Sequence, residues 1–481
     1  MRVLFVHPHR IYNEVPLGLL YLSSVLKKEG HKTRLLSLNS CRTTAGDTPQ
    51  TALEKSLREQ LTYFVPDMVG FSVMSTAVDM CLRLARIAKE RGCFVIFGGP
   101  HPTVDPEGTI TQEAVDAICI GEGEHALLEL VTRLNANQDI TNIQNMWVKD
   151  RDRIHKNGIR SLIGDLDSLP FPDRDILDLE NLDPKSMEFR GANFVTGRGC
   201  PYKCSYCINA HLRTLYHGNR NFVRFREIPA VIAEIKYVVQ KFKPSKVVFS
   251  DEIFTLKKQR LIAFCETYAR EVALPFYCQS RANTIDEEVA VALKVANCEL
   301  INIGIESGNE YIRNTILNRK MSESTIKRAF RLLKKAGIQT GTFTMIGMPF
   351  ESEAMIRETI KLNREVRPDL LHCTIMMPFK GTQIRDIYEK NKWLASEPTD
   401  SYYSQVTQSL PTVSQSKLLA YQRLFDLFIY APFWSLLVVK FLLFLWSCVP
   451  VSNTKISFVT RVIRSLAYRL TTIARKWLIS T

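Results

Sequence analysis

The chain has 481 residues, more than one hydrophobic core usually organises, so we expect two or three domains. Its 46% hydrophobic and 23% charged residues are typical of a globular protein and exclude a disordered one. The formal net charge of +14 suggests an anionic partner, which could be nucleic acid, a membrane surface or an acidic substrate.

The first residues show no signal peptide. The apolar run 3–6 meets the polar sequence His7-Pro8-His9 and is too short to direct secretion. We therefore expect a cytoplasmic protein, and a reducing compartment keeps its cysteines as thiols. Most of the 12 cysteines are scattered, which is typical of small buried hydrophobic side chains.

The N-terminal third alternates short apolar runs with helical patterns. Two helices are expected at about 18–28 and 76–90, each ending near a glycine, Gly30 or Gly92. Strands are expected at 3–7, 33–38, 68–73, 94–97 and 117–120. Strands rich in Val, Ile and Phe between helices indicate a parallel sheet covered on both faces. This predicts an α/β, doubly wound, Rossmann-like domain over residues 1–140.

Ligands of such sheets bind beyond the carboxyl ends of the strands. The loops expected there are 8–10, 72–76, 98–103 and 121–124. Gly98, Gly99 and Gly121 in these loops would let the backbone approach a bulky ligand closely. The GxGxxG pattern of nicotinamide-binding proteins does not occur, which disfavours that cofactor.

Residues 141–185 are predicted to be a linker. They begin with a hairpin-like pattern at about 142–162 and continue into an extended segment that contains Pro170 and Pro172. A second alternating series follows, with strands expected at 193–196, 246–250, 276–279, 300–305, 340–346 and 371–376. Helices are expected between them, for example at 227–242, 286–295 and 322–336. Six strand–helix units can curl into a partial TIM-like barrel over 186–395, with its chemistry at the carboxyl ends of the strands.

Three cysteines lie close together directly after the first strand of this series. Cys200, Cys204 and Cys207 fall within eight residues, and Gly199 with Pro201 allows a tight loop. Three thiolates can hold three corners of an iron–sulfur cubane and leave one iron open for a chelating ligand. The alternatives are a zinc site completed by His211 and a purely structural group of cysteines; we expect His211 to lie on the helix after the loop.

The spacing Cys200-x3-Cys204-x2-Cys207, with Tyr206 before the last cysteine, resembles the motif of the radical S-adenosylmethionine enzymes. Further segments resemble that family's substrate-contacting strand ends. Phe249-Ser250-Asp251-Glu252 is similar to the segment that contacts the methionine amine. Gly304 to Gly308, which includes Glu306 and Ser307, is similar to the segment near the ribose. Ile346-Gly347-Met348-Pro349 is similar to the segment near adenine. The resemblance implies a [4Fe–4S] cluster that cleaves S-adenosylmethionine to a 5′-deoxyadenosyl radical. It also implies an electron donor such as flavodoxin or ferredoxin. Asp251 and Glu252 could each equally be solvated loop carboxylates.

The N-terminal domain, through Pro16 to Leu22 and Gly98 to Pro102, resembles the cobalamin-binding domain joined to one large radical subgroup. The Asp-x-His-x-x-Gly motif that supplies a histidine to cobalt elsewhere is missing, so His9 and His101 are expected to be loop residues. A Rossmann-like scaffold without a cofactor is the alternative. With cobalamin, the resemblance implies methylation of an unreactive carbon, or ring closure or rearrangement.

The helical C-terminal region, residues 396–481, changes character after Asp426, the last acidic residue. Residues 427–451 are almost wholly apolar apart from Pro432 and Lys440, and 456–478 form a basic amphipathic pattern. The segment 427–451 could contact a membrane or pack as a buried hairpin. We favour attachment of the tail to the inner membrane surface, which would suit a hydrophobic or lipid-like substrate.

Two other functions compete with this interpretation. A methylthiotransferase acting on RNA or protein would need a second three-cysteine cluster in the N-terminal domain, and Cys41, Cys81, Cys93 and Cys119 do not lie in the strand-end loops. A cobalamin sensor or carrier would leave the three clustered cysteines without a role. No nucleic-acid partner is expected, because the basic tail carries no RNA-binding motif.

Overall fold

The structure is a computed structural model that describes residues 1–9, 15–41, 46–179, 188–217, 221–397, 405–432 and 436–447. The chain forms two compact units. The first contains residues 1–201, 208–252 and 267–276, and the second contains 202–207, 253–266 and the chain from 277 onward.

The first unit is built on a seven-stranded sheet with the order β2-β1-β3-β4-β5-β6-β7. Its strands are β1 (Arg2–His7), β2 (Lys32–Ser37), β3 (Met68–Ser72), β4 (Phe94–Gly98), β5 (Ala117–Cys119), β6 (Met146–Asp150) and β7 (Arg153–Lys156). The pairs from β2 to β5 are parallel. The predicted parallel sheet is confirmed, with strand bounds within one or two residues of those expected.

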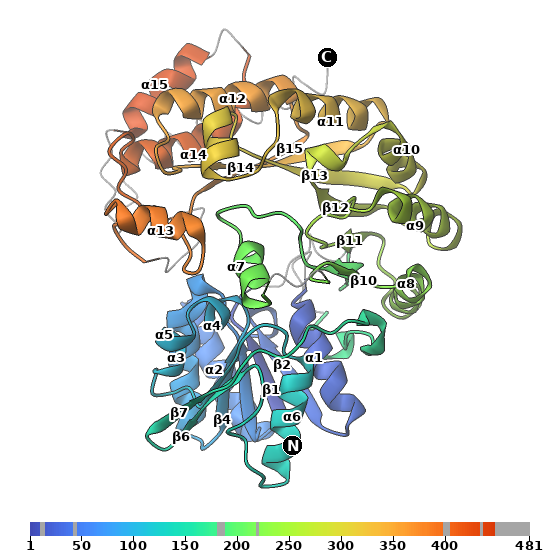
Figure 1. Ribbon diagram of the computed structural model, residues 1–481, viewed down its shortest axis with the longest axis vertical. Helices are drawn as coiled ribbons and strands as arrows, with labels where there is room; N and C mark the ends of the chain where they lie inside the picture. The colour runs from blue at the N-terminus through green and yellow to red at the C-terminus, as the bar shows by residue number, and fades with distance from the viewer. Residues whose placement is uncertain are drawn as a thin grey trace. The chain divides into compact units, whose positions relative to one another are not determined.

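Helices cover both faces of this sheet (Figure 1). The helices of the domain are α1 (Leu17–Lys28), α2 (Pro49–Tyr63), α3 (Val78–Lys89), α4 (Pro100–Val104), α5 (Pro106–Ile110) and α6 (Glu124–Asn135). Leu53 and Leu84 of α2 and α3 pack with Leu4 and Val6 in one core, while α1 and α6 pack with Val3 and Phe5 in another. Alternate side chains of β1 thus enter opposite cores, as expected of a strand buried on both faces.

The hairpin of β6 and β7 belongs to the sheet and not to a linker. β6 pairs antiparallel with β5, and β7 pairs antiparallel with β6. The sheet therefore extends to Lys156, past the expected domain end at residue 140. The physical reason is that Met146 and Val148 of β6 join the core beside α6.

The rest of the first unit begins the second series of strands. It holds β8 (Asn193–Phe194), β9 (Gly197–Arg198), α7 (Ile208–Leu215), β10 (Arg224–Phe225), α8 (Ile228–Phe242) and β11 (Val247–Phe249). β8 pairs parallel with β11, and β9 pairs antiparallel with β10. His211 lies on α7, as expected.

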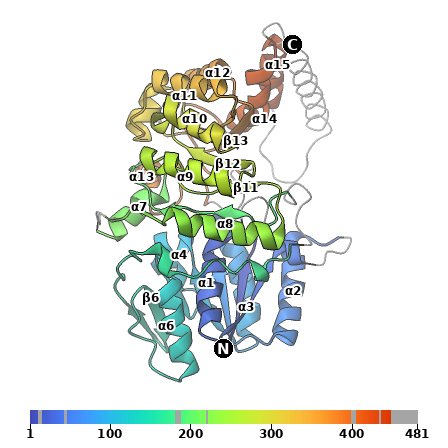
Figure 2. The same ribbon diagram turned by 90° about the vertical axis from the view of Figure 1, so that its right-hand side faces the viewer.

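Six strands form the second sheet in the order β15-β14-β13-β12-β11-β8, which is the sequential order of a partial barrel. The remaining strands are β12 (Phe276–Ser280), β13 (Cys298–Glu306), β14 (Gln339–Ile346) and β15 (Leu370–Ile375). The associated helices are α9 (Lys258–Glu271), α10 (Glu287–Val295), α11 (Glu323–Lys335), α12 (Glu353–Val366) and α13 (Gln383–Lys390). Within the second unit, β13, β14 and β15 pair in parallel, and α11 and α12 lie along one face of them (Figure 2).

The C-terminal apolar segment is divided between two helices of the second unit, α14 (Gln415–Tyr430) and α15 (Leu436–Ser447). Leu427, Phe428 and Ile429 at the end of α14 are buried, so the first part of the segment is core, in agreement with the hairpin alternative. In the part of the chain that the structure describes, no helix is long and apolar enough to cross a membrane. The amphipathic pattern at 456–478 lies outside the described residues.

Candidate active site

A cavity of about 480 Å³ lies in the first unit at the carboxyl end of the parallel sheet. Its floor comes from the strand ends and loops that sequence reasoning singled out, including Ser72, Gly98, Gly99 and Gly121. Residues of β9 and α7, such as Gly197 and Leu212, line it as well, and most of its wall is apolar. Parallel α/β sheets bind ligands at this edge.

Glycines leave space along the wall of this cavity. A Cβ atom added at Gly98 would meet only Cys119 Cβ, at 3.8 Å. Gly99 has φ +98° and Gly121 has φ +77°, backbone conformations that residues with a side chain rarely adopt, and a Cβ at Gly121 would overlap the Tyr216 hydroxyl. The wall therefore admits a bulky ligand close to the backbone.

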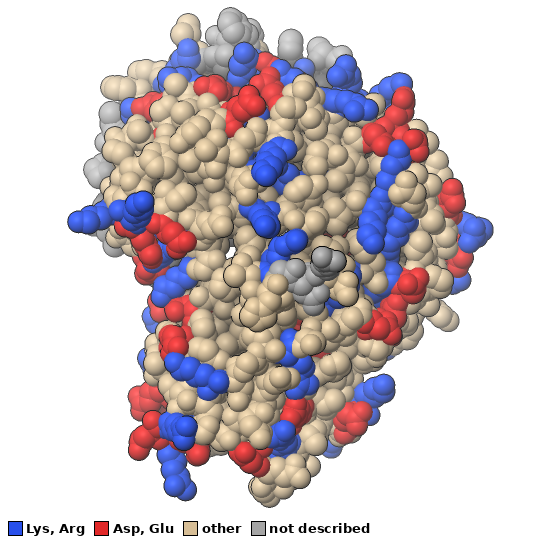
Figure 3. All heavy atoms as spheres, in the orientation of Figure 1, with Lys and Arg blue, Asp and Glu red and all other residues tan. Residues whose placement is uncertain are grey.

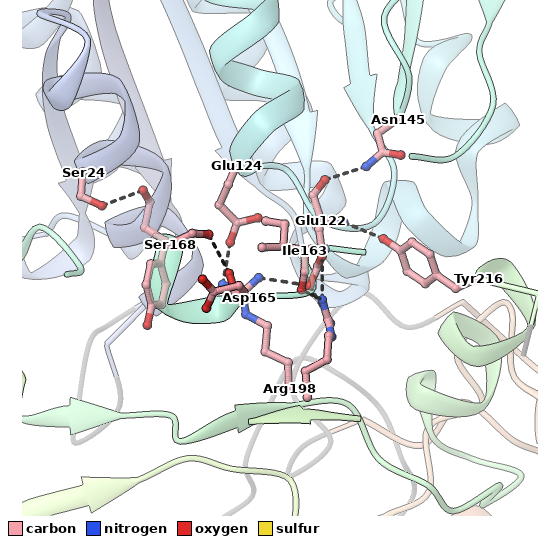
Figure 4. A network of polar contacts seen from close by, with 11 residues as sticks. Ser24, Glu122, Glu124, Asn145, Ile163, Asp165, Ser168, Arg198 and Tyr216 are labelled. Carbon is pink, nitrogen blue, oxygen red and sulfur yellow. Dashed lines mark hydrogen bonds and ion pairs between the residues drawn. The ribbon is translucent and has the colours of Figure 1, made fainter. Parts of the chain in front are cut away.

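A partly buried polar network lines one side of the cavity (Figure 4). Glu122, in the loop after β5, accepts hydrogen bonds from Arg224 at 2.8 Å and 3.1 Å and from Arg198 at 3.2 Å. Arg198 also donates to Glu124 at 2.6 Å, and the Glu122 N–H donates to the Tyr216 hydroxyl at 2.9 Å. Burial alone would raise the pKa of Glu122, but the two arginines hold it below its usual value. The carboxylate thus stays charged and fixes the loop after β5 against β9 and β10.

The first cysteine of the motif follows directly from the cavity wall. Gly199, which lines the cavity, has φ +88°, and a Cβ there would overlap the Phe222 carbonyl group. Only glycine fits this turn, which delivers the chain into Cys200. Cys200 belongs to the first unit and is partly exposed.

The other two cysteines lie in residues 202–207, which belong to the second unit. Ser205 anchors this loop, because its N–H donates to Leu317 O at 3.2 Å and its hydroxyl to Ile316 O at 2.6 Å. Asn318 donates to Lys203 O at 2.8 Å. The loop is thus fixed before any ligand binds.

Two arginines stand beside the cysteine loop within the second unit. Arg281 donates to the Sγ atom of the buried Cys204 at 3.5 Å, and Arg319 donates to the Tyr206 hydroxyl at 2.6 Å. Both guanidinium groups thus donate into the loop that carries the cysteines. Among the described residues, no three His, Cys, Asp or Glu side chains are grouped closely enough to hold a metal ion.

Glu306 forms a buried ion pair with Arg319, with 3.1 Å between Oε1 and Nη1. A bulge at the end of β13 gives Glu306 a φ of +63°, an uncommon conformation that often marks a functional site. Burial raises the pKa of Glu306, and the Arg319 charge opposes the rise. Burial also raises the pKa of Tyr206 well above its usual value, so its hydroxyl stays protonated.

The side chains of residues 250–252, directly after β11, have two different surroundings. Asp251 is buried and accepts hydrogen bonds from the Thr196 N–H at 3.0 Å and the Thr196 hydroxyl at 2.7 Å, which fasten β11 to the chain after β8. Ser250 and Glu252 instead line the cavity. Asp251 therefore supports the fold, whereas the Glu252 side chain is left at the cavity.

Ser307 and Gly347 are buried within the second unit. The Ser307 hydroxyl lies 3.3 Å from that of Thr359 on α12. Gly347 has φ +82° and donates its N–H to Glu351 at 2.6 Å. Its carbonyl accepts hydrogen bonds from Tyr388 and from Gln408, the latter at 3.3 Å, so the turn after β14 is held from three directions.

Sequence reasoning missed Arg281, Arg319 and Glu351. Arg281 directly follows the end of β12, where a polar residue could have been singled out by the strand-end rule. Arg319 and Glu351 lie in loops away from the cysteine motif, and only the fold brings Arg319 to Tyr206.

Comparisons with known proteins assign families to two parts of the chain. The family model of the B12 binding domain matches residues 10–131, and that of the radical SAM superfamily matches residues 194–362. An uncharacterised methyltransferase of Pyrococcus horikoshii is 30% identical over 373 residues, which cover 77% of each chain. The chain belongs to the cobalamin-binding radical S-adenosylmethionine enzymes.

Other relatives of this radical enzyme are more distant. The anaerobic magnesium-protoporphyrin IX monomethyl ester cyclase of Rubrivivax gelatinosus is 27% identical and covers 79% of this chain and 68% of its own. The hopanoid C-3 methylase of Methylococcus capsulatus is 24% identical, with coverage of 80% and 72%. The solved structure of the radical S-adenosylmethionine methyltransferase TsrM from Kitasatospora setae, with cobalamin and a [4Fe–4S] cluster bound, shares the fold with a TM-score of 0.65 at 19% identity, covering 82% of this chain and 79% of its own.

The cofactors of the enzyme are a [4Fe–4S] cluster, S-adenosylmethionine and cobalamin. The residues present fit these groups. In the second unit, the Cys204 thiol beside the Arg281 guanidinium is a donor that suits an iron–sulfur cluster. In the first unit, the glycine-lined apolar cavity suits a large macrocycle.

Filling the cavity at Gly98 should remove cobalamin. We expect Gly98→Leu to lower the hydroxocobalamin retained per chain after desalting at least tenfold, because its side chain would occupy ligand space. Gly158→Leu provides the control, since a Cβ there meets no atom within 4 Å and Gly158 does not line the cavity. Equal retention by Gly98→Leu and the native chain, measured by visible absorbance, would contradict the assignment of the cavity.

Glu351 should make stability depend on pH. Burial raises the pKa of Glu351 to about 7, and the N–H groups of Gly347 and Met348 oppose the rise. Since the acid is more easily protonated when folded, the native chain should lose stability relative to Glu351→Gln as pH rises from about 4.5 to 7, by roughly 3 kcal/mol. The difference in melting temperature between the native chain and Glu351→Gln is measured at pH 5 and at pH 8. Glu358→Gln, an exposed position on the following helix α12, is the control. A difference in melting temperature between the native chain and Glu351→Gln that does not change with pH would refute the prediction.

Proposed function

We propose that this enzyme methylates an unactivated carbon of a hydrophobic or lipid-like molecule, or closes a ring in one, through a 5′-deoxyadenosyl radical. Two relatives support the substrate class, since one is named for a hopanoid and the other for a magnesium-protoporphyrin ester, both large and largely apolar molecules.

One observation carries the proposal. Residues 197–199 line the cavity of the first unit and lead directly into Cys200. The site suited to cobalamin and the first ligand of the iron–sulfur cluster are therefore consecutive in the chain and share one unit. A shared support of this kind suits chemistry in which both cofactors act on one substrate.

We assign roles to the chain's own residues as follows. Cys200, Cys204 and Cys207 hold the cluster, and Arg319 with Tyr206 keeps the loop oriented and dry. Gly98, Gly99 and Gly121 admit cobalamin. Glu252 and Glu306 offer carboxylates to S-adenosylmethionine, while Ser250, Asp251, Ser307 and Gly347 shape the strand ends around it. When bound, the cluster supplies the electron that cleaves S-adenosylmethionine and cobalamin supplies a methyl carrier.

We further propose that the enzyme acts at the cytoplasmic face of a membrane and receives electrons from a flavodoxin or ferredoxin. We also propose a cobalamin-binding domain at 1–140, a linker at 141–185, the radical barrel at 186–395 and a helical C-terminal region at 396–481. The sheet of the first domain reaches Lys156. The formal net charge of +14 supports an acidic electron carrier.

A methylthiotransferase is the weaker alternative, because it needs a second cysteine cluster. Cys81 and Cys93 are buried in one core of the first domain, and Cys119 lies in the other. Burial raises the pKa of Cys119 to about 12, so this thiol stays protonated. These cysteines are placed as core residues, which argues against a second cluster.

Removing the three cluster cysteines should abolish both iron binding and catalysis. In the anaerobically reconstituted Cys200→Ala/Cys204→Ala/Cys207→Ala variant, we expect iron and sulfide to fall from about four each per chain to background. Cleavage of S-adenosylmethionine under dithionite should fall with them. Cys41→Ala is the control for loss of an unrelated, partly buried thiol. Unchanged cleavage by the triple variant would overturn the radical mechanism.

The substrate class can be tested without knowing the substrate. The enzyme loaded with its cofactors is incubated with S-adenosylmethionine labelled in the methyl group and with a lipid extract, and label should enter the organic phase. Formation of 5′-deoxyadenosine with new unlabelled lipid products would favour ring closure. Label found only in aqueous products would refute the hydrophobic substrate.

A further inference from the structure

Helix α15 of the second unit is apolar almost throughout, with the sequence LLVVKFLLFLWS. Its inner face packs on the core, because Val439 is 2% exposed and Leu443 packs against the same cluster as the end of α14. Its outer face does not enter that core. Leu437 is 75% exposed, Phe441 59% and Phe444 63%.

These side chains form one stripe. Residues 437, 441 and 444 are spaced by four and three positions, which places them on the same side of a helix, and the exposed Lys440 lies within the stripe. Large hydrophobic side chains that are exposed singly need no explanation, but a contiguous apolar stripe marks an interaction surface.

We propose that this stripe of α15 binds the surface of an anionic lipid bilayer. The proposal deepens the proposed function and rests on it, since a lipid-like substrate would be drawn from the same surface. A helix of 12 residues is about 18 Å long, which is well short of the ~30 Å hydrocarbon layer, so α15 would lie along the interface. Lys440 can then extend from the apolar stripe to the lipid phosphates.

Charge favours an anionic surface. From residue 427 to the end, the sequence carries seven basic residues and no acidic ones, which is half of the net charge of +14. On the face of the molecule shown in Figure 3, by contrast, basic and acidic side chains are interspersed. An apolar insertion combined with a basic segment supplies the two attractions that stable peripheral binding needs.

A second copy of the chain is a poorer occupant of the stripe. In a symmetric contact between two α15 helices, Lys440 would be buried at the interface, and α15 offers no acidic residue to neutralise it. Lipid phosphates provide that neutralisation.

The full chain, loaded with its cofactors, is sedimented with lipid vesicles. The vesicles contain either phosphatidylcholine alone or phosphatidylcholine with phosphatidylglycerol. We expect the native chain to sediment with the anionic vesicles, and Leu437→Gln/Phe441→Gln to bind them about tenfold more weakly. Val291→Gln/Val295→Gln is the matched control, because these residues are 54% and 61% exposed at the same spacing on α10. Lys440→Glu should reduce the preference for anionic over neutral vesicles.

Cleavage of S-adenosylmethionine is measured in each preparation. Normal cleavage by the double variant shows that it is folded, whereas loss of cleavage in the native chain would count against the proposed function and not against the surface. The inference fails if the native chain stays in the supernatant with both vesicles, or if the double variant sediments as the native chain does. It also fails if the only effect of the double substitution is that a dimer of the native chain becomes a monomer in analytical ultracentrifugation.

Discussion

The first unit depends on one partly buried carboxylate, that of Glu122. Arg224 and Arg198 both donate to it, and its own N–H donates to the hydroxyl of Tyr216, the residue after α7. A charge in this environment is tolerated only with its partners in place, since removing one arginine would leave uncompensated charge away from water. The loop after β5 and the β9–β10 pair are therefore fixed together. Both the cavity and the turn at Gly199 rely on that attachment.

In the second unit, side-chain hydrogen bonds hold the short, irregular loop 202–207 in place. Ser205 and Asn318 provide hydrogen bonds that a helix or sheet would normally supply. The pair of Arg319 and Glu306 then places charge beside Tyr206 in a dry environment, where electrostatic interactions are stronger than in water. Such a loop needs little reorganisation when it binds a metal cluster, which lowers the cost of assembling the site.

The strands and the cysteine loop could be predicted from sequence because their signals are local. Apolar periodicity located the strands of both sheets, and the spacing of Cys200, Cys204 and Cys207 is a property of a few adjacent residues. Asp251 shows where such reasoning stops, because its partner Thr196 lies 55 residues earlier and no local pattern links them. The hairpin of β6 and β7 was assigned to a linker for the same reason, since its membership of the sheet depends on pairing with β5. In the apolar segment after Asp426, hydropathy alone did not reveal which residues would pack on the core and which would be exposed on α15.

The turn at Gly347 depends on residues beyond the part of the chain that the radical family model covers. That match ends at residue 362, yet the Gly347 carbonyl is held by Tyr388 of α13 and by Gln408, and Leu418 of α14 packs within 3.2 Å of the position that a Cβ would take. The barrel is thus completed by residues that lie beyond the match to the family model. Relatives with unrelated C-terminal regions must support this turn differently. Exchanging C-terminal regions between two such enzymes would alter the barrel itself and not merely its periphery.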